Sequence, residues 1–291
     1  MGVFFLYLSM KHLLTCCELP KCMLDYEDTL NDYDFVLYHQ YLKDETYRNN
    51  YLNKRKTQPD RMMILDNSAY EFFVSGEKFI EEDFIRVIKE LKPTYYIVPD
   101  VLMDYQKTFE NFMHWIEIIP TISDSQPYFV PQGKTFNEFM DCVSRMSSLI
   151  RFNNLPKNFC IPFHNDFFLD RNQLDNIKIK RLIFGRRELT KDEEYAYGRM
   201  VLMDKLTSLY PDYTFHMLGS HNPIEIKHYD IFDNIISFDS GYPVKLAISG
   251  VKLGEEQEKP NIIIDDFYGA DLSYHIKELI VHNICEMKYL I

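Results

Sequence analysis

The chain has 291 residues, of which 46% are hydrophobic and 15% aromatic, and its formal net charge at pH 7 is −12. A chain of this size and composition can bury a large core, which excludes a mainly disordered or low-complexity protein. The negative charge also excludes binding to nucleic acid through the overall field, because such binding draws its strength from neutralised phosphates. A polynucleotide site therefore requires a local basic patch.

The amino-terminal run Met1–Ser9 is apolar, but no basic residue precedes it and no small-residue cleavage pattern follows it. It lacks the form of a secretory signal peptide, and no stretch of the sequence reaches the roughly 18 apolar residues of a membrane span. We expect a cytoplasmic protein without a membrane partner.

Short apolar runs rich in β-branched and aromatic residues alternate with longer segments of helical period, a pattern typical of βα units around a parallel sheet. Eight runs are predicted as strands: Val3–Leu8, Asp34–Tyr38, Met62–Leu65, Tyr95–Val98, Tyr128–Val130, Phe159–Pro162, Phe215–Leu218 and Ile235–Phe238. The predicted helices include Glu81–Leu91, Thr108–Ile118, Thr135–Leu149, Asp192–Leu209 and Asp271–Tyr289. This order predicts an α/β fold, a single (β/α)₈ TIM barrel that occupies residues 1–291 as one domain.

Polar residues follow most of the predicted strands directly. Barrel enzymes carry their chemistry on the loops at the carboxyl ends of the strands, so these positions are the first candidates for a site. They include Asp66, Asp100, Gln132, Gly219 and Asp239. An isolated Asp at such a position is equally often a turn or helix-cap residue, so the case depends on the positions taken together.

Five short segments between Met62 and Pro243 have the order and spacing of the motifs of one enzyme family. The segments are ILDNSAYE (Ile64–Glu71), VPDV (Val98–Val101), VPQG (Val130–Gly133), HMLGS (His216–Ser220) and SFDSGYP (Ser237–Pro243). Together they resemble the motifs of the tRNA-guanine transglycosylase (queuine tRNA-ribosyltransferase) superfamily. The resemblance implies a TIM-barrel glycosyltransferase, a pentosyltransferase that replaces guanine in a polynucleotide by a 7-deazaguanine base.

The resemblance implies catalytic roles for two aspartates. Asp239 corresponds to the nucleophile, whose carboxylate traps the oxocarbenium-like sugar as a covalent glycosyl intermediate. Asp66 corresponds to the second carboxylate, which exchanges a proton with the departing and incoming bases. No cofactor and no metal are expected.

The resemblance also implies a set of base-binding residues. Asp100 accepts from the N–H edge of the base, and Gln132 with the Gly133 backbone N–H addresses its carbonyl. Tyr70 stacks on the ring, while Leu218 and the adjoining Gly219 close the opposite face. Taken singly, Tyr70 and Leu218 are more often ordinary core residues.

Two departures from the tRNA enzymes bear on the substrate. The chain has no Cys-rich, zinc-binding extension at its carboxyl terminus, and it has CIPFHND (Cys160–Asp166) where those enzymes have a Gly-rich run. In its compact size it is most similar to the small phage-type 7-deazaguanine DNA transglycosylases. This similarity favours DNA over tRNA as the polymer, with the free 7-deazaguanine base as second substrate, in the host cytoplasm if a virus encodes the chain.

Two groups of basic residues are candidates for contacts with the polymer backbone. The first comprises Lys54, Arg55, Lys56 and Arg61, and the second lies between Lys178 and Arg187 and includes Arg186 and Arg187. We expect both groups to flank the carboxylates, although ordinary solvated surface charge is the commoner reason for such runs.

Three other interpretations remain open. The same chemistry on tRNA is the first, and a non-catalytic paralogue that serves as a binding subunit is the second. The third is a metallohydrolase that uses His164, Asp166, His216 and His221, although no HxH or HxxxH pair is present. A second copy of the chain, forming a homodimer, is the other partner that we consider.

Overall fold

The computed structural model describes residues 13–122, 124–163, 165–176, 180, 183–185, 187–255 and 267–289. Over these residues the strands are β1 (Leu14–Cys17), β2 (Asp34–Leu37), β3 (Met63–Asp66), β4 (Tyr95–Ile97), β5 (Gln126–Tyr128), β6 (Asn158–Ile161), β7 (Thr214–Met217) and β8 (Ile235–Ser240). The α-helices are α1 (Glu27–Leu30), α2 (Tyr38–Lys43), α3 (Glu45–Thr57), α4 (Ala69–Ser75), α5 (Glu81–Leu91), α6 (Tyr105–Ile118), α7 (Phe136–Phe152), α9 (Lys191–Leu209), α10 (Pro223–Tyr229), α11 (Tyr242–Ile248) and α12 (Tyr274–Tyr289). Three short 3₁₀ helices are η1 (Lys21–Tyr26), η2 (Ile119–Thr121) and η3 (Asp166–Leu169).

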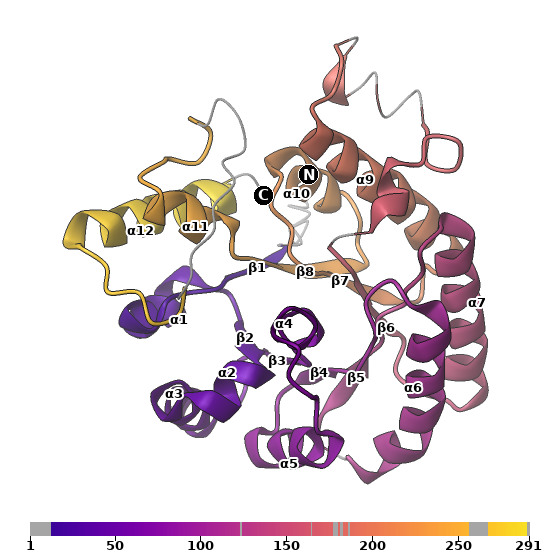
Figure 1. Ribbon diagram of the computed structural model, residues 1–291, viewed down its shortest axis with the longest axis horizontal. Coiled ribbons are helices and arrows are strands. Elements are labelled where there is room, and N and C mark those ends of the chain that lie inside the picture. Colours follow the sequence, from indigo (N-terminus) through magenta and orange to yellow (C-terminus); the bar gives the residue numbers. More distant parts are fainter. Residues whose placement is uncertain are drawn as a thin grey trace, which may run out of the picture.

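The expectation of a single closed eight-stranded barrel is wrong. The strands form two separate four-stranded parallel sheets, a first sheet in the order β2-β3-β4-β5 and a second in the order β1-β8-β7-β6. Most helices lie around the outside of the two sheets (Figure 1). The fold is therefore α/β, as the alternation of runs predicts, but the strand ladder is interrupted at two places.

The physical reason lies at the two seams between the sheets. Between β5 and β6 the contact is one bridge, Phe129 with Phe159, rather than a ladder. Between β1 and β2, side chains replace part of the ladder: the Asp32 carboxylate accepts from the Thr15 N–H at 2.9 Å, and Asn31 Oδ1 accepts from the Cys17 N–H at 2.8 Å. A count of apolar runs cannot distinguish such seams from a continuous ladder.

The core has two parts. A large apolar cluster includes residues of the helices and strands, and a smaller cluster joins the inner faces of both sheets. The smaller cluster contains Cys16 of the second sheet with Phe35 and Tyr128 of the first. The buried ring of His216 on β7 stacks on Phe35 at a centroid distance of 5.6 Å and lies 6.0 Å from the Tyr128 ring. The two sheets thus hold one shared interior between them.

The predicted elements agree with the structure in part. The prediction of Glu81–Leu91 is confirmed without a change of bounds, as α5, and seven predicted strands coincide with β2–β8 to within a few residues. The run Val3–Leu8 lies outside the described residues, and the first observed strand, Leu14–Cys17, was not predicted. Over the described residues, every helix is too short or too polar to traverse a lipid bilayer.

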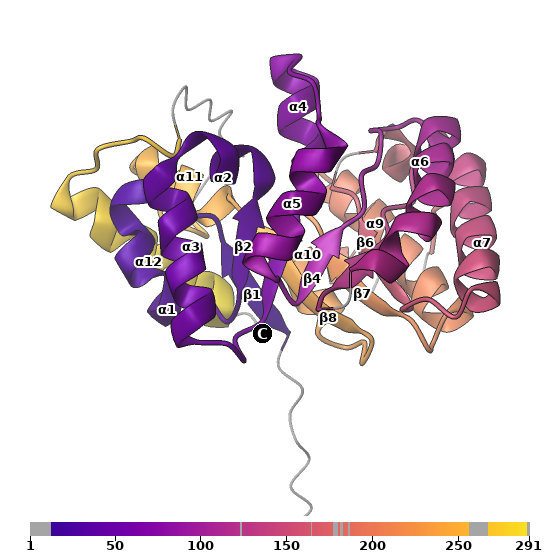
Figure 2. The same cartoon turned by 90° about the horizontal axis from the view of Figure 1, so that it is seen from below.

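Helix α4 has an unusual position. It directly follows β3 and projects from the body of the molecule (Figure 2), and none of its residues is buried. Its aromatic and aliphatic residues Tyr70, Phe73 and Val74 are each more than 60% exposed. Helix α4 therefore marks the side of the molecule on which β3 ends.

Candidate active site

Of the three predicted aspartates, Asp66 lies close enough to Asp100 and to Asp239 for their charges to act on it. Asp66 ends β3, Asp100 follows β4, and Asp239 lies near the end of β8 in the other sheet. Burial raises the pKa of Asp66 well above its ordinary value, and the charges of Glu71, Asp239 and Asp100 raise it further, against a hydrogen bond from the Ser68 N–H that lowers it. A carboxylate cluster, comprising Asp66, Glu71, Asp100 and Asp239, therefore draws residues from both sheets.

Asp239 is buried and held by two donors. Its Oδ1 lies 3.1 Å from Nε2 of His216 and accepts from the Gly219 N–H, also at 3.1 Å. Nδ1 of His216 lies 2.8 Å from the Ser237 hydroxyl oxygen. In the tautomer that carries its proton on Nε2, the imidazole donates to Asp239 and its Nδ1 accepts from Ser237. The chain Ser237–His216–Asp239 fixes the orientation of the carboxylate.

Asp100 is held by two side-chain amides. Its Oδ1 accepts from Asn67 at 2.9 Å and its Oδ2 from Gln132 at 2.7 Å. Gln132 in turn accepts from the Met103 N–H at 3.1 Å, so its carboxamide oxygen is engaged within the protein. Burial raises the pKa of Asp100, and the two amide hydrogen bonds lower it. In this structure Gln132 positions Asp100, and its predicted contact with a base carbonyl stays a prediction.

The turn after β3 is strained and well anchored. Ser68 has a left-handed backbone with φ 58°, which is uncommon for a residue other than glycine. Its N–H donates to Asp66 Oδ2 at 2.8 Å, and its hydroxyl oxygen accepts from the His39 N–H at 3.1 Å. Burial lowers the pKa of His39 to about 4, so this imidazole is neutral at pH 7. The buried neighbours of the turn maintain this conformation, which orients the Asp66 carboxylate.

Two glutamates of the site were given no role by sequence reasoning. Glu71 on α4 is partly exposed, but the loss of part of its hydration, and then the charge of Asp239, raise its pKa. Glu18 directly follows β1 and accepts from the Tyr268 hydroxyl at 3.0 Å. Burial, and then the charge of Asp239, raise the pKa of Glu18 to about 7. The signal for Glu18 was its place after a strand, but that strand was missed.

The other predicted base-binding residues differ in their surroundings. Tyr70 is 64% exposed on α4, and half-buried Leu218 packs against the smaller apolar cluster. A Cβ atom on Gly133 would lie 2.5 Å from the backbone nitrogen of Phe139, so this glycine permits close packing against α7. Gly219 donates its N–H to Asp239. Stacking by Tyr70 and the base contacts of Gly133 and Gly219 stay predictions.

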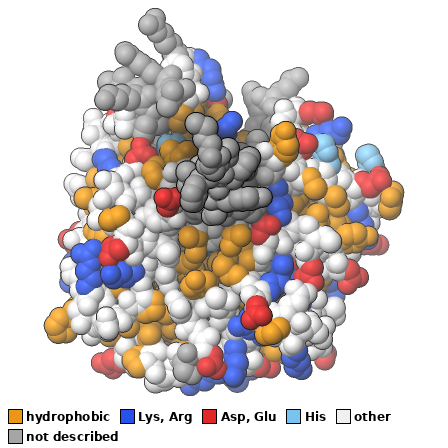
Figure 3. All heavy atoms as spheres, turned by 180° about the vertical axis from the view of Figure 1, so that it is seen from behind, with side chains coloured by type: hydrophobic (Ala, Val, Ile, Leu, Met, Phe, Trp, Pro, Cys, Tyr) orange, Lys and Arg blue, Asp and Glu red, His pale blue; other side chains and the backbone are white. Residues whose placement is uncertain are grey.

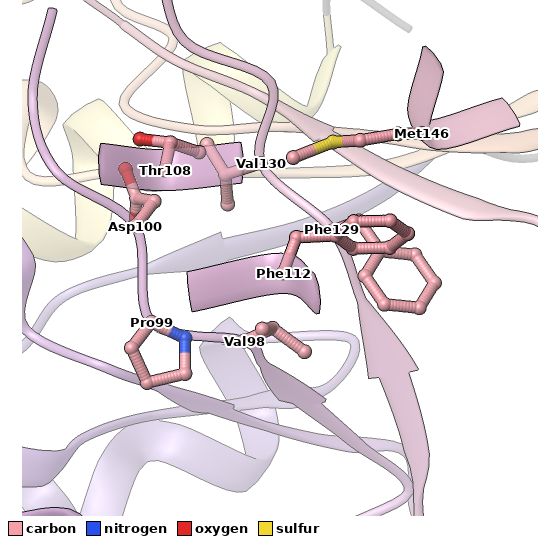
Figure 4. A pocket seen from close by; sticks show the side chains of 8 residues that line it. All are labelled: Val98, Pro99, Asp100, Thr108, Phe112, Phe129, Val130 and Met146. Carbon is pink, nitrogen blue, oxygen red and sulfur yellow. The ribbon is translucent and has the colours of Figure 1, made fainter. Parts of the chain in front are cut away.

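A small cavity lies beside Asp100 (Figure 4). Its lining is mainly apolar and includes Val98, Phe112, Phe129 and Met146, and it is too tight to admit a water molecule. Neither Asp66 nor Asp239 lines it. The cavity is a packing gap between the first sheet and its helices, and Asp100 borders it.

In the first basic group, Lys54 and Arg61 form ion pairs within the fold. Lys54 is buried, with its ammonium 2.8 Å from Glu27 and 3.1 Å from Asp34, and Arg61 lies 3.0 Å from Asp34. Asp34 begins β2, so these ion pairs lie at the amino ends of the strands, away from the carboxylates. The expectation that Lys54 and Arg61 flank the carboxylates is therefore wrong.

The other predicted basic residues that the structure describes have separate surroundings. Arg55 donates to the carbonyls of Pro59 and Arg61, and Lys56 is exposed. Arg187 pairs with Glu193, and Arg186 lies outside the described residues. On the face turned away from α4, basic and acidic side chains are interspersed (Figure 3). A backbone contact by Arg55, Lys56 or Arg187 stays a prediction.

The histidines of the metallohydrolase interpretation have separate surroundings. His216 is bonded to Ser237 and Asp239, whereas His221 lies 2.7 Å from Asp192. His164 lies outside the described residues. In the part of the chain that the structure describes, no three His, Cys, Asp or Glu side chains are grouped to hold a metal ion.

Comparison of the sequence with models of known protein families and with curated proteins finds no match. The chemistry of the site must therefore be argued from its own residues.

Proposed function

We propose that the protein is a nucleobase-exchanging transglycosylase that replaces guanine in a polynucleotide by a 7-deazaguanine base through a covalent intermediate on Asp239. The observation that carries the proposal is the pairing of an oriented, buried carboxylate, Asp239, with a nearby carboxyl, Asp66, whose pKa is raised. Exchanging the base on an N-glycosidic bond with retention of configuration at the anomeric carbon needs two such groups in different protonation states. The order of the five sequence segments supports the same chemistry.

In the first half-reaction, an oxygen of Asp239 attacks the anomeric carbon while the bond from that carbon to the guanine nitrogen breaks. The bonding electron pair leaves with the guanine, and protonated Asp66 donates a proton to it. In the second half-reaction, Asp66 takes a proton from the incoming base. The nitrogen of that base then attacks the anomeric carbon and displaces Asp239. Every proton and electron pair is returned, so no oxidant or further reactant is needed.

Asp100 is the candidate for base recognition. Its two amide partners leave lone pairs of the carboxylate free, because each oxygen can accept more than one hydrogen bond. These lone pairs suit the N–H edge of a guanine-like ring. A target guanine in duplex DNA would have to leave the stack to reach this position.

DNA is favoured over tRNA as the polymer, on the resemblance to small DNA-modifying members alone. The test offers the purified protein labelled guanine or a labelled 7-deazaguanine together with duplex DNA or unmodified tRNA, with and without a chelator. We expect label in DNA, a protein–DNA adduct that resists SDS and turns over on adding free base, and no effect of chelation. Label only in tRNA would replace the preferred polymer, and neither label nor adduct would favour the binding-subunit interpretation.

A further inference from the structure

One peptide group connects a buried ion pair to the nucleophile of the proposed reaction. The carbonyl of Leu218 accepts from Nη2 of Arg199 at 3.0 Å, and the N–H of the same peptide group, that of Gly219, donates to Asp239 Oδ1 at 3.1 Å. The Leu218–Gly219 peptide is therefore bonded on one side to a cation and on the other to a carboxylate.

The cation is deeply buried and forms an ion pair. Arg199 on α9 and Glu225 on α10 are each about 1% exposed at their side chains, and their charged atoms lie 2.7 Å apart. Replacing a buried ion pair by apolar residues is often neutral or stabilising, so folding stability alone gives a weak reason for this pair. Its guanidinium faces the carbonyls that end β6 and β7, those of Ile161 and Leu218.

The backbone at Gly219 fixes the direction of the N–H. Gly219 has φ 60°, and a Cβ atom there would lie 2.9 Å from Cβ of Phe163. Both facts require glycine at this position. The peptide plane before Gly219 therefore has little freedom, and its carbonyl faces Arg199 when its N–H faces Asp239.

We propose that Arg199 is a positioning residue for Asp239, acting through the Leu218–Gly219 peptide. The guanidinium fixes the plane of this peptide and polarises it, which strengthens the hydrogen bond that its N–H donates. That bond holds Oδ1 of Asp239 together with His216, so the other oxygen is presented to the anomeric carbon. The inference rests on the proposed function for its catalytic consequence, but the link between Arg199 and the Gly219 N–H is a property of the fold.

The test compares Arg199→Lys with wild type. Lysine keeps a positive charge opposite Glu225 but lacks the planar fork that binds Glu225 and the Leu218 carbonyl together. In single-turnover experiments we expect adduct formation to slow by about 10- to 100-fold, as for lost support of a site residue, with an unchanged dissociation constant for the polymer. Arg171→Lys is the matched control, because Arg171 also binds backbone carbonyls, those of Phe168 and Leu174, rather than the carbonyl of the peptide that donates to Asp239.

A second readout does not depend on activity. The amide proton of Gly219, followed by nuclear magnetic resonance, should shift and exchange faster in Arg199→Lys and should not change in Arg171→Lys. If Arg199→Lys fails to fold, the pair Arg199→Met with Glu225→Met replaces the ions by apolar side chains and should give the same loss of rate and the same amide shift.

The outcomes separate the two proposals. A wild-type protein that forms no adduct would contradict the proposed function, while the Gly219 amide would still decide whether Arg199 controls this bond. An adduct that forms at the wild-type rate in Arg199→Lys, or an unchanged Gly219 amide, would overturn the inference.

Discussion

Asn67 donates its side-chain amide to Oδ1 of Asp100 at 2.9 Å, and the same amide nitrogen donates to the carbonyl of Val98 at 3.0 Å. The residue after the β3 strand is thereby tied to the end of β4. The Asp100 carboxylate is thereby fixed before a ligand arrives, which is the condition for selecting one hydrogen-bonding edge over another in the role that we propose for it.

We predict that Asp100→Asn changes base choice more than the rate of bond cleavage. The new amide nitrogen would face either Asn67 or Gln132, and both of these side chains are also donors. It would also present a donor to the N–H edge of the base, where an acceptor is needed. Preference for guanine over adenine should fall at least about 10-fold, and stability should fall by about 1–3 kcal/mol from the unsatisfied group. Competition between labelled bases, with denaturant unfolding alongside, measures both. An unaltered preference would remove Asp100 from base recognition.

Asp239→Asn should abolish the covalent adduct and base exchange while the protein stays folded. An amide oxygen cannot trap the sugar cation as an ester, and no other described group occupies its position between His216 and Gly219. The surface substitution Asp212→Asn, which removes a carboxylate that pairs with Lys157, is the control. Detection of the same adduct in Asp239→Asn on denaturing gels would assign the nucleophile elsewhere.

Glu18 should make the free energy of unfolding depend on pH between its ordinary pKa of 4.5 and about 7. Its pKa is raised in the folded state, so the folded protein binds more protons there and stability falls as the pH rises through this range. Glu18→Gln should equal wild type near pH 4 and exceed it by about 1–3 kcal/mol at pH 9, the upper value being the full shift. Parallel pH curves of the two proteins in urea unfolding would contradict this.

Lys54→Met should destabilise the fold rather than weaken contact with a polymer. The substitution removes one of the cations that pair with Glu27 and Asp34, which are 3% and 0% exposed. The free energy of unfolding should therefore fall by about 3–5 kcal/mol. Lys56→Met, two residues along the same helix and exposed, should change stability by no more than about 0.5 kcal/mol. A salt slope of polymer binding lowered by about one in folded Lys54→Met would contradict the assignment.

The sequence predicted local elements better than their connections. Glu81–Leu91 has acidic residues in its first turn and a strong apolar face, and such a helix is legible from periodicity. Leu14–Cys17 is short and contains Thr15, whereas the preceding run from Val3 is longer and more strongly apolar, so the run from Val3 was chosen and β1 was not predicted. The division into two sheets depends on which groups satisfy backbone N–H donors at the seams, and no apolar pattern encodes that choice.

For the candidate site too, local patterns could be read from the sequence but long-range contacts could not. Asp66, Asp100 and Asp239 were predicted as site residues because each lies at the end of an apolar run, and their roles stay predictions. Glu18 was missed with its strand. Lys54 was misjudged because a Lys-Arg-Lys run has the form of solvated charge, and only the burial of Glu27 and Asp34 around it reveals an ion-pair network. Long-range pairing of this kind is invisible to local pattern.

At the seam between β1 and β2, amino-acid substitutions can change how the two sheets are joined. Peptide groups are common to nearly all amino acids, so a ladder made of them is hard to remove by substitution. At this seam the side chains of Asn31 and Asp32 accept hydrogen bonds that a ladder would otherwise supply, and each acceptor can be lost or regained by one amino-acid substitution. Selection at these two positions can therefore tighten or loosen the junction between the first sheet and β1, the strand that precedes Glu18, without altering Asp66, Asp100 or Asp239. Related proteins can in this way diverge in rigidity while they keep the same site carboxylates.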